Sequence, residues 1–169
     1  DVGVDSLFKI PDTTISNTYT VSANSSVAPG NSFYSEAKEY TLNISNGVGL
    51  NYAVIESGFI EVEIFSEIQE NIIVEYIIPS AIKSGDTLKL TETILAGTSS
   101  NPSHFVKQID ISGYELDLTG ISKAEINTLV TRAVGTVDPN ASAPAQLNFG
   151  DQVVFNNKLI DVVPYFVRG

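Results

Sequence analysis

Apolar and polar residues alternate along several short stretches of this chain, and this pattern restricts its fold more than any other feature. Ile60, Val62 and Ile64 occupy every second position, and the residues between them are Glu61 and Glu63. Only an extended strand places every second side chain on one face. The alternation therefore predicts a strand that buries its three aliphatic side chains and turns both glutamates to solvent.

Other stretches show the same pattern or are rich in β-branched and aromatic residues, and turn residues separate them. We expect turns at Asn46-Gly47, Ser57-Gly58 and Asn156-Asn157, and a strand end at Pro79. About nine or ten short, mainly antiparallel strands with this spacing are typical of a β-sandwich. The predicted fold class is therefore all-β.

The stretch 122–134 is ambiguous. Ser122 and Glu125 fit a helix capping box, and apolar residues at helical spacing follow them. The β-branched residues of this stretch, among them Val130, Thr131 and Val134, favour a strand. We expect a strand, with a helix as the alternative.

A length of 169 residues suits one domain. Residues 1–12 show little pattern and are predicted to form an extended leader, whereas residues 13–169 are predicted to form a single β-sandwich domain. Within it, we expect strands 60–65 and 72–78 to pair as a hairpin with Ile64 opposite Val74. This register also brings Glu63 opposite Glu75, at a cost of up to about 1 kcal/mol.

The chain is acidic, with 20 acidic residues, 9 basic residues and a net charge of −11. Such a charge repels phosphate groups, so we do not expect nucleic acid or anionic membrane surfaces as partners. No stretch reaches the roughly 18–20 consecutive apolar residues of a membrane helix. The chain has no cysteine, which excludes disulfides and thiol chemistry and favours a bacterial envelope protein.

No group of residues predicts a catalytic, cofactor or metal site, and we predict that the chain is not an enzyme. His104 is the single histidine and is expected at the surface or at a rim. The spacing of Glu61 and Glu63 suits glycoside hydrolysis, but strand alternation explains it more simply, since the polar face of an amphipathic strand carries charge. Calcium is the most plausible ion because the loops 138–140 and 150–151 are rich in oxygen, although no Asp-x-Asp-x-Asp pattern supports it.

About half the chain resembles uncharacterised cell-envelope β-sandwich lipoproteins of Bacteroidetes. The segments that carry the resemblance are LNISNGV (42–48), ESGFIEV (56–62), YIIPSAIKSG (76–85) and ISGYELDL (111–118). The resemblance implies an extracytoplasmic location at the outer membrane or cell surface, with other envelope proteins as partners. It implies membrane contact only through a lipid-anchored cysteine upstream of Asp1, and no catalytic residues.

Three short segments are similar to the O-glycosylation motif of the Bacteroidetes envelope, in which aspartate precedes serine or threonine. They predict modification at Ser6, Thr13 and Thr87, each of which follows an aspartate.

Apolar side chains near the two ends of the chain are the predicted partner contacts, because an isolated domain would expose them. They are Leu7 and Phe8 in the leader and Tyr165 and Phe166 near the other end. The alternative is that they close the sandwich. The predicted function is that of a non-catalytic structural or adaptor domain of the cell envelope, acting through protein–protein contacts. The alternative function is a carbohydrate-binding or adhesive module, although the chain has no tryptophan to stack on sugars.

Overall fold

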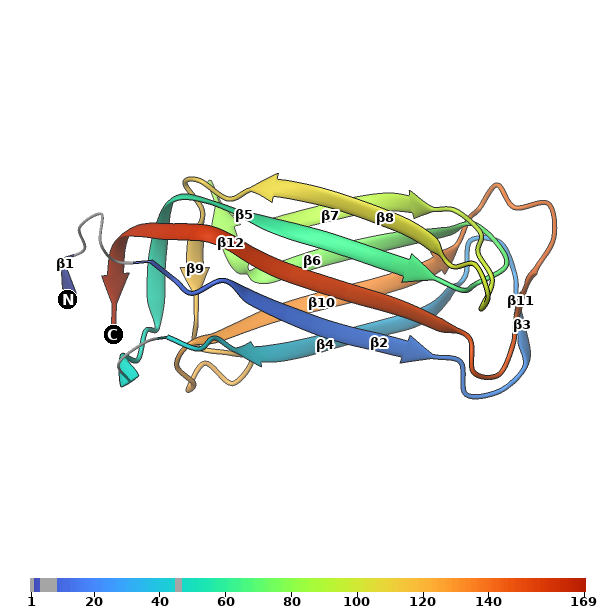
Figure 1. The fold of residues 1–169 in the computed structure, drawn as a ribbon, viewed down its shortest axis with the longest axis horizontal. Helices are drawn as coiled ribbons and strands as arrows, with labels where there is room; N and C mark the ends of the chain where they lie inside the picture. Colours follow the sequence, from blue (N-terminus) through green and yellow to red (C-terminus); the bar gives the residue numbers. More distant parts are fainter. Residues whose placement is uncertain (1, 4–8, 45–46) are drawn as a thin grey trace.

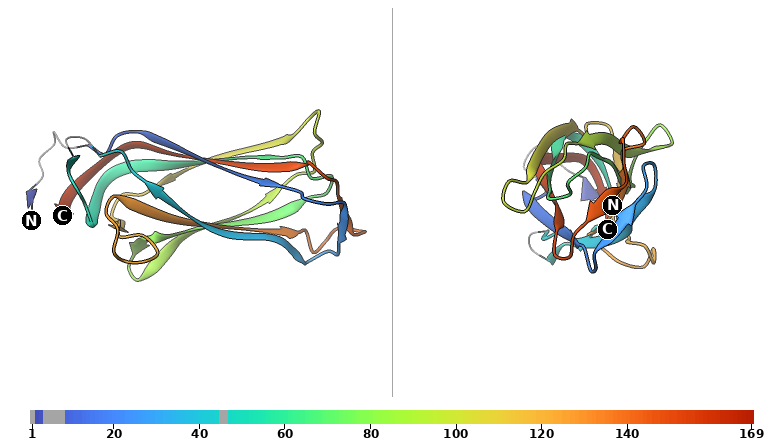
Figure 2. Two further views of the ribbon diagram at one scale, coloured as in Figure 1. Left: turned by 90° about the horizontal axis from the view of Figure 1, so that it is seen from below. Right: turned by 90° about the vertical axis from the view of Figure 1, so that its right-hand side faces the viewer.

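The structure is a computed structural model that describes residues 2–3, 9–44 and 47–169. Every pair of strands in these residues is antiparallel, and they contain no α-helix. The strands form two facing layers of an elongated sandwich, shown from three directions in Figures 1 and 2. The predicted all-β sandwich is therefore confirmed. Among the described residues there is no helix that could cross a membrane.

Each layer contains four long strands. The first has the order β2 (Thr13–Thr20), β12 (Gln152–Arg168), β5 (Tyr52–Ser66) and β8 (Ser103–Asp110). The second has the order β4 (Ser32–Thr41), β10 (Thr128–Val137), β6 (Ile72–Lys83) and β7 (Asp86–Ile94). Because most successive strands change layer, the chain winds round the sandwich in the manner of an eight-stranded jelly roll.

Short strands close the two ends. β9 (Glu115–Asp117) pairs with both β5 and β6 and so joins the layers at the end where β1 (Val2–Gly3) pairs with β12. β3 (Ser25–Val27) pairs with β11 (Ala145–Leu147) at the opposite end (Figure 1). The strands are longer than predicted, since β5 has 15 residues and β12 has 17.

The core lies between the layers and is built from alternate residues of facing strands. Ile60, Val62 and Ile64 of β5 are buried, and so are Tyr76 and Ile78 of β6. The glutamates between these apolar residues are more exposed, as the alternation predicts. Burying each large side chain stabilises the fold by roughly 1.5–3 kcal/mol.

The predicted hairpin between 60–65 and 72–78 is wrong. β5 pairs with β12 and β8, whereas β6 pairs with β10 and β7, so the two strands face each other across the core. Ile64 lies opposite Phe155 and Phe105 rather than Val74. Alternation fixes which face a residue occupies but does not select the partner strand. The separation of the strands also removes the predicted contact between like charges.

Three of the predicted turn signals lie inside strands. Gly58 lies within β5, Asn156-Asn157 within β12, and Pro79 within β6. The register of β6 shifts between Ile78 and Ile82, which fits a proline in a bulge. The fourth signal also fails as a hairpin, because the strands on either side of Gly47 belong to different layers; Asn46 lies outside the described residues.

The strand predicted in 122–134 is confirmed for its second part, which forms β10. The first part belongs to an irregular loop over residues 119–127, called here the 119–127 loop. Ser122 does not cap a helix. Its hydroxyl instead accepts a hydrogen bond from the backbone N–H of Ala124 at 3.2 Å.

Gly58 lies where the pairing of β5 with β12 becomes irregular. Both strands bend near one end of the sandwich (Figure 1). The φ of Gly58 is 141°, and a Cβ atom on it would lie 2.7 Å from the Cα of Val162. On the core side, burial changes from odd to even positions across this bend, from Ile55 to Ile60. The register shows Asp161 and Val162 of β12 against Gly58 and an extra residue of β5 at Glu56, so Gly58 lies in a bulged segment that redirects the strand.

We expect Gly58→Ala to lower the free energy of unfolding by about 3 kcal/mol or more, because backbone atoms block the added methyl group. The matched control is Gly85→Ala, where φ is 87° but no atom lies within 4 Å of the added Cβ. It should cost only about 1–2 kcal/mol. Urea unfolding measures both, and equal losses would contradict the role of the Gly58–Val162 contact.

Asn157 interrupts the core-facing side of β12 between Phe155 and Leu159. It is 5% exposed, and its Oδ1 has no hydrogen-bond partner among the described residues. We expect Asn157→Leu to raise the free energy of unfolding by about 1 kcal/mol, because it removes an unpaired buried polar group at similar volume. A thermal melt should show a midpoint higher by about 2–4 °C. A lower midpoint would mean that the amide of Asn157 makes a contact that stabilises the fold.

Candidate functional site

Beyond the Gly58 bend, β12, β5 and β9 form a small sheet at one end of the sandwich, called here the end sheet. Arg168 lies opposite Tyr52, and Tyr52 lies opposite Asp117. The neighbouring Ala53 and Leu116 are buried. Because strand residues alternate between faces, Arg168, Tyr52 and Asp117 share the face of the end sheet that points away from the core.

An open pocket of about 440 Å³ lies against this outer face. Its walls combine two carboxylates, one guanidinium, one phenol, one amide and one hydroxyl with a single aliphatic side chain. They are Glu115, Asp117, Arg168, Tyr52, Asn51, Thr119 and Ile82.

Tyr52 lies at the centre of this pocket wall. Its hydroxyl donates a hydrogen bond to Oε1 of Glu115, and the guanidinium of Arg168 lies 4.5 Å from its ring centroid. Phe166 packs edge-on against the same ring at 6.0 Å. The hydrogen bond to Glu115 raises the pKa of Tyr52, and burial adds to this. Tyr52 is therefore a neutral donor at physiological pH.

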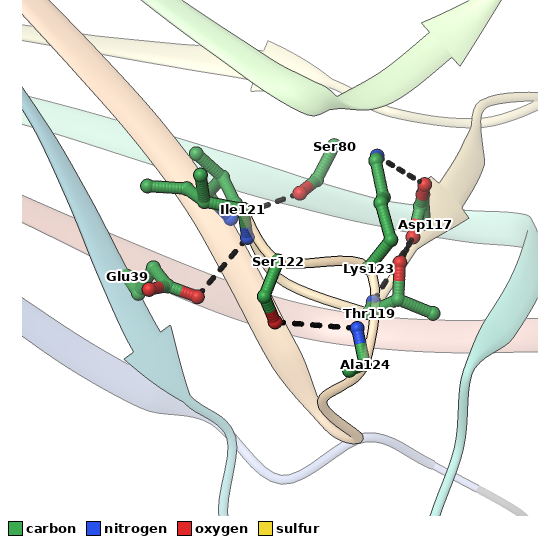
Figure 3. Close-up of polar contacts among 9 residues, drawn as sticks. Glu39, Ser80, Asp117, Thr119, Ile121, Ser122, Lys123 and Ala124 are labelled. Carbon is green, nitrogen blue, oxygen red and sulfur yellow. Dashed lines mark hydrogen bonds and ion pairs between the residues drawn. The ribbon is translucent and has the colours of Figure 1, made fainter.

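Asp117 joins the pocket to the 119–127 loop (Figure 3). Its Oδ1 accepts hydrogen bonds from the backbone N–H and the hydroxyl of Thr119, and its Oδ2 accepts one from Lys123 Nζ at 2.7 Å. Burial alone would raise the pKa of Asp117, but the bonds from Lys123 and Thr119 outweigh it and hold the pKa below its usual range. Asp117 is thus a charged, fully engaged carboxylate.

The 119–127 loop is held at further points. Glu39 Oε2 accepts a hydrogen bond from the backbone N–H of Ile121 at 3.1 Å (Figure 3). Asn127 Oδ1 accepts one from the N–H of Leu50 at 2.7 Å. Lys123 and Asn127 have positive φ values of 63° and 52°, a strained conformation that the surrounding bonds must maintain. Hydrogen bonds to neighbouring strands therefore fix the loop beside the pocket.

The residues considered from the sequence for acid–base chemistry lie elsewhere. Glu61 and Glu63 lie on the outer face of the first layer, and Glu63 accepts hydrogen bonds from Asn156 at 3.1 Å and shares one with His104 at 2.8 Å. His104 is half-exposed and stacks on Phe65 at 4.4 Å. Glu61 accepts a hydrogen bond from Gln108 at 3.3 Å, and none of these side chains lines the pocket of the end sheet.

The predicted partner contacts fall partly outside the described residues, since Leu7 and Phe8 are not described. Tyr165 is an extra residue in β12, because Pro164 lies opposite Ile55 and Phe166 lies opposite the adjacent Val54. This bulge leaves Tyr165 58% exposed. Its hydroxyl is near enough to that of Tyr52 to contribute to the raised pKa of Tyr52. Phe166 is half-buried against the same ring.

The predicted glycosylation positions also differ in accessibility. Ser6 lies outside the described residues. Thr13 is half-buried at the start of β2, and its hydroxyl donates to the carbonyl of Pro11 at 2.9 Å. Thr87 is exposed near the start of β7, beside the turn at Ser84-Gly85.

The two oxygen-rich loops do not gather their carboxylates. In the part of the chain that the structure describes, no three histidine or acidic side chains converge as metal ligands would. Asp138 Oδ1 accepts a hydrogen bond from the N–H of Asn140 at 2.9 Å, which is ordinary turn chemistry.

None of the pocket residues was predicted from the sequence as a site residue. Glu115 and Asp117 flank the buried Leu116, so their alternation carries the same signal as Glu61 and Glu63. No local pattern singles out Arg168 or Asn51. They reach the site only because β12 pairs with β5 over its whole length.

No protein-family model matches the chain, and no curated protein matches its sequence. Among solved structures, it is similar to a chain of Broad Bean Stain Virus, with 10% identity, a TM-score of 0.36, and coverage of 89% of this chain and 91% of that one. It is also similar to a family 11 carbohydrate-binding module from Clostridium thermocellum, with 15% identity, a TM-score of 0.33 and coverage of 95% of both chains. A chain of the infectious bursal disease virus Gx strain shows 14% identity and a TM-score of 0.35, with 96% of this chain and 41% of that chain covered. Likenesses this distant say nothing about activity.

Glycosylation stays a prediction, and the exposure of Thr87 and Thr13 predicts which of them is modified more fully. Protein isolated from its native host should carry added sugar mass at Thr87 before Thr13, because Thr87 is exposed and Thr13 is half-buried with its hydroxyl engaged. Peptide mass spectrometry measures the occupancy of each position, with Thr87→Ala as the control. Unmodified peptides at both threonines would contradict the prediction.

Proposed function

We propose that the domain binds oligosaccharides in the pocket of the end sheet. The observation that carries the proposal is the composition of the wall, which combines charged acceptors, donors and an aromatic ring in one open hollow. Sugars present many hydroxyls that both donate and accept, so they suit a wall that offers both kinds of group. The alternative function drawn from the sequence is thereby preferred over the adaptor function.

Tyr165 supplies the flat apolar surface that the pocket itself lacks. The ring of Tyr52 already contacts Arg168 on a face and Phe166 at an edge. Tyr165 projects from its bulge with 58% of its surface exposed. Bulges beside binding sites often redirect a side chain in this way. A sugar ring beside the one in the pocket would stack on Tyr165, which removes the need for tryptophan.

Binding fits the pocket better than hydrolysis. Glu115 and Asp117 lie two residues apart on one strand, a spacing that invites comparison with glycosidases. A glycosidase needs a carboxylic acid whose pKa is raised, so that it can donate a proton. The pKa of Asp117 is instead lowered by Lys123 and Thr119, once their bonds have outweighed burial. Asp117 therefore serves as a fixed acceptor and as the anchor of the loop.

Contact with a protein partner is the second candidate function. The observation that favours it is the pair of exposed aliphatic side chains on the 119–127 loop, Ile121 at 57% and Ile126 at 55%. Such side chains beside a glycan pocket suit a partner that holds the domain near its ligand. An adaptor role in the bacterial cell envelope, with other envelope proteins as neighbours, remains part of this proposal.

Replacing Tyr165 tests the proposed function. On a glycan array, the unmodified domain should bind a defined set of oligosaccharides, and Tyr165→Ala should bind the same set about five- to ten-fold more weakly through loss of stacking. Phe149→Ala is the matched control. Phe149 is also exposed, at 73%, but lies in the loop between β11 and β12 at the opposite end of the sandwich.

Titration calorimetry of the tightest ligand gives the affinities, and thermal melts show whether each variant folds. Failure of the unmodified domain to bind any glycan would overturn the proposal. Equal losses from Tyr165→Ala and Phe149→Ala would remove the end sheet as the binding site.

A further inference from the structure

The hydrogen bonds already made in the pocket indicate which chemical groups its ligand must supply. Both oxygens of Asp117 accept hydrogen bonds from Thr119 and Lys123. One oxygen of Glu115 accepts the bond from Tyr52. Much of the acceptor capacity of the wall is therefore used within the protein.

The N–H donors of Arg168, in contrast, have no partner among the described residues. Within the described residues, no carboxylate lies within salt-bridge distance of its guanidinium, and no acceptor forms a hydrogen bond with it. The ring of Tyr52 holds the guanidinium at 4.5 Å, so its position is fixed without consuming its N–H groups. A guanidinium has five such donors in a planar fork, which matches the two oxygens of a carboxylate.

One acceptor remains available beside this fork. The second oxygen of Glu115 has no partner among the described residues, and it calls for a hydroxyl donor. A neutral sugar would satisfy this acceptor but offer Arg168 no charge, and a simple anion would do the reverse. Only a ligand that carries a carboxylate and hydroxyls together satisfies both.

We propose, building on the proposed function, that the pocket selects a uronic acid residue whose carboxylate binds Arg168 and one of whose hydroxyls binds Glu115. The net charge of −11 sets a further condition, because it repels a long polyanion. The preferred glycan therefore carries an isolated uronate between neutral sugars. One neutral neighbour would stack on Tyr165.

Calorimetric titration of two matched trisaccharides tests this. One has a single glucuronate between two neutral hexoses, and the other is its carboxyl-reduced counterpart. We expect the acidic trisaccharide to bind about ten-fold or more tightly, as one charge-assisted, two-point contact would give. Arg168→Gln should remove this difference, because it removes the charge that pairs with the carboxylate. Arg168→Lys should retain part of the difference, because it keeps the charge but loses the fork.

Arg132→Gln is the matched control. Arg132 is an exposed arginine on β10 whose guanidinium donates to Ser35 at 3.0 Å, so its replacement should alter neither affinity. Equal binding of both trisaccharides to the unmodified domain would overturn the uronate proposal while leaving sugar binding intact. Binding of neither trisaccharide nor any glycan on the array would overturn the proposed function as well. Thermal melts identify any variant that fails to fold, and Arg168→Lys then decides the test.

Discussion

The pairing of β5 with β12 is the constraint on which the rest of the structure depends. These are the two longest strands, and they lie at the centre of the first layer, with β2 and β8 on either side. Their register runs from Val153 opposite Ser66 to Arg168 opposite Tyr52. It thus joins residues that are 87 to 116 positions apart in the sequence. Because the two strands bend together near Gly58 and Val162, one pairing builds both the sandwich wall and the end sheet.

The sequence predicts which residues are buried more reliably than it predicts which strands are partners. The alternation at Ile60, Val62 and Ile64 identifies their core face correctly, because burial on one face is a local property. The partner strands follow from how distant segments pack, and no local pattern encodes them. Turn signals mislead for a related reason. A glycine in a bulge and a glycine in a hairpin look alike in the sequence, so Gly58 predicts a turn although the strand continues through it.

The candidate site shows the same division. The pair Glu115 and Asp117 can be recognised from the sequence as two carboxylates on one face of a short strand. Arg168 cannot be assigned to them from the sequence, since only the register of β12 with β5 brings it beside Tyr52. Tyr165 is recognisable as an apolar residue near the end of the chain, but its exposure results from a bulge that the sequence does not reveal. Chemistry assembled across strands thus becomes visible only once the strands are paired.

Asp117 links the binding chemistry of the pocket to the order of the 119–127 loop. A carboxylate that only accepted hydrogen bonds from sugar hydroxyls would need free oxygens. Both oxygens of Asp117 instead accept hydrogen bonds from Thr119 and Lys123. Its first task is therefore to hold a loop that contains strained positive-φ residues at Lys123 and Asn127. Because the same side chain forms part of the pocket wall, a loosened loop would also move that wall. The proposed sugar recognition and the exposure of Ile121 and Ile126 would consequently depend on one anchor. That anchor provides a physical route by which a bound glycan and a protein partner on the loop would affect each other.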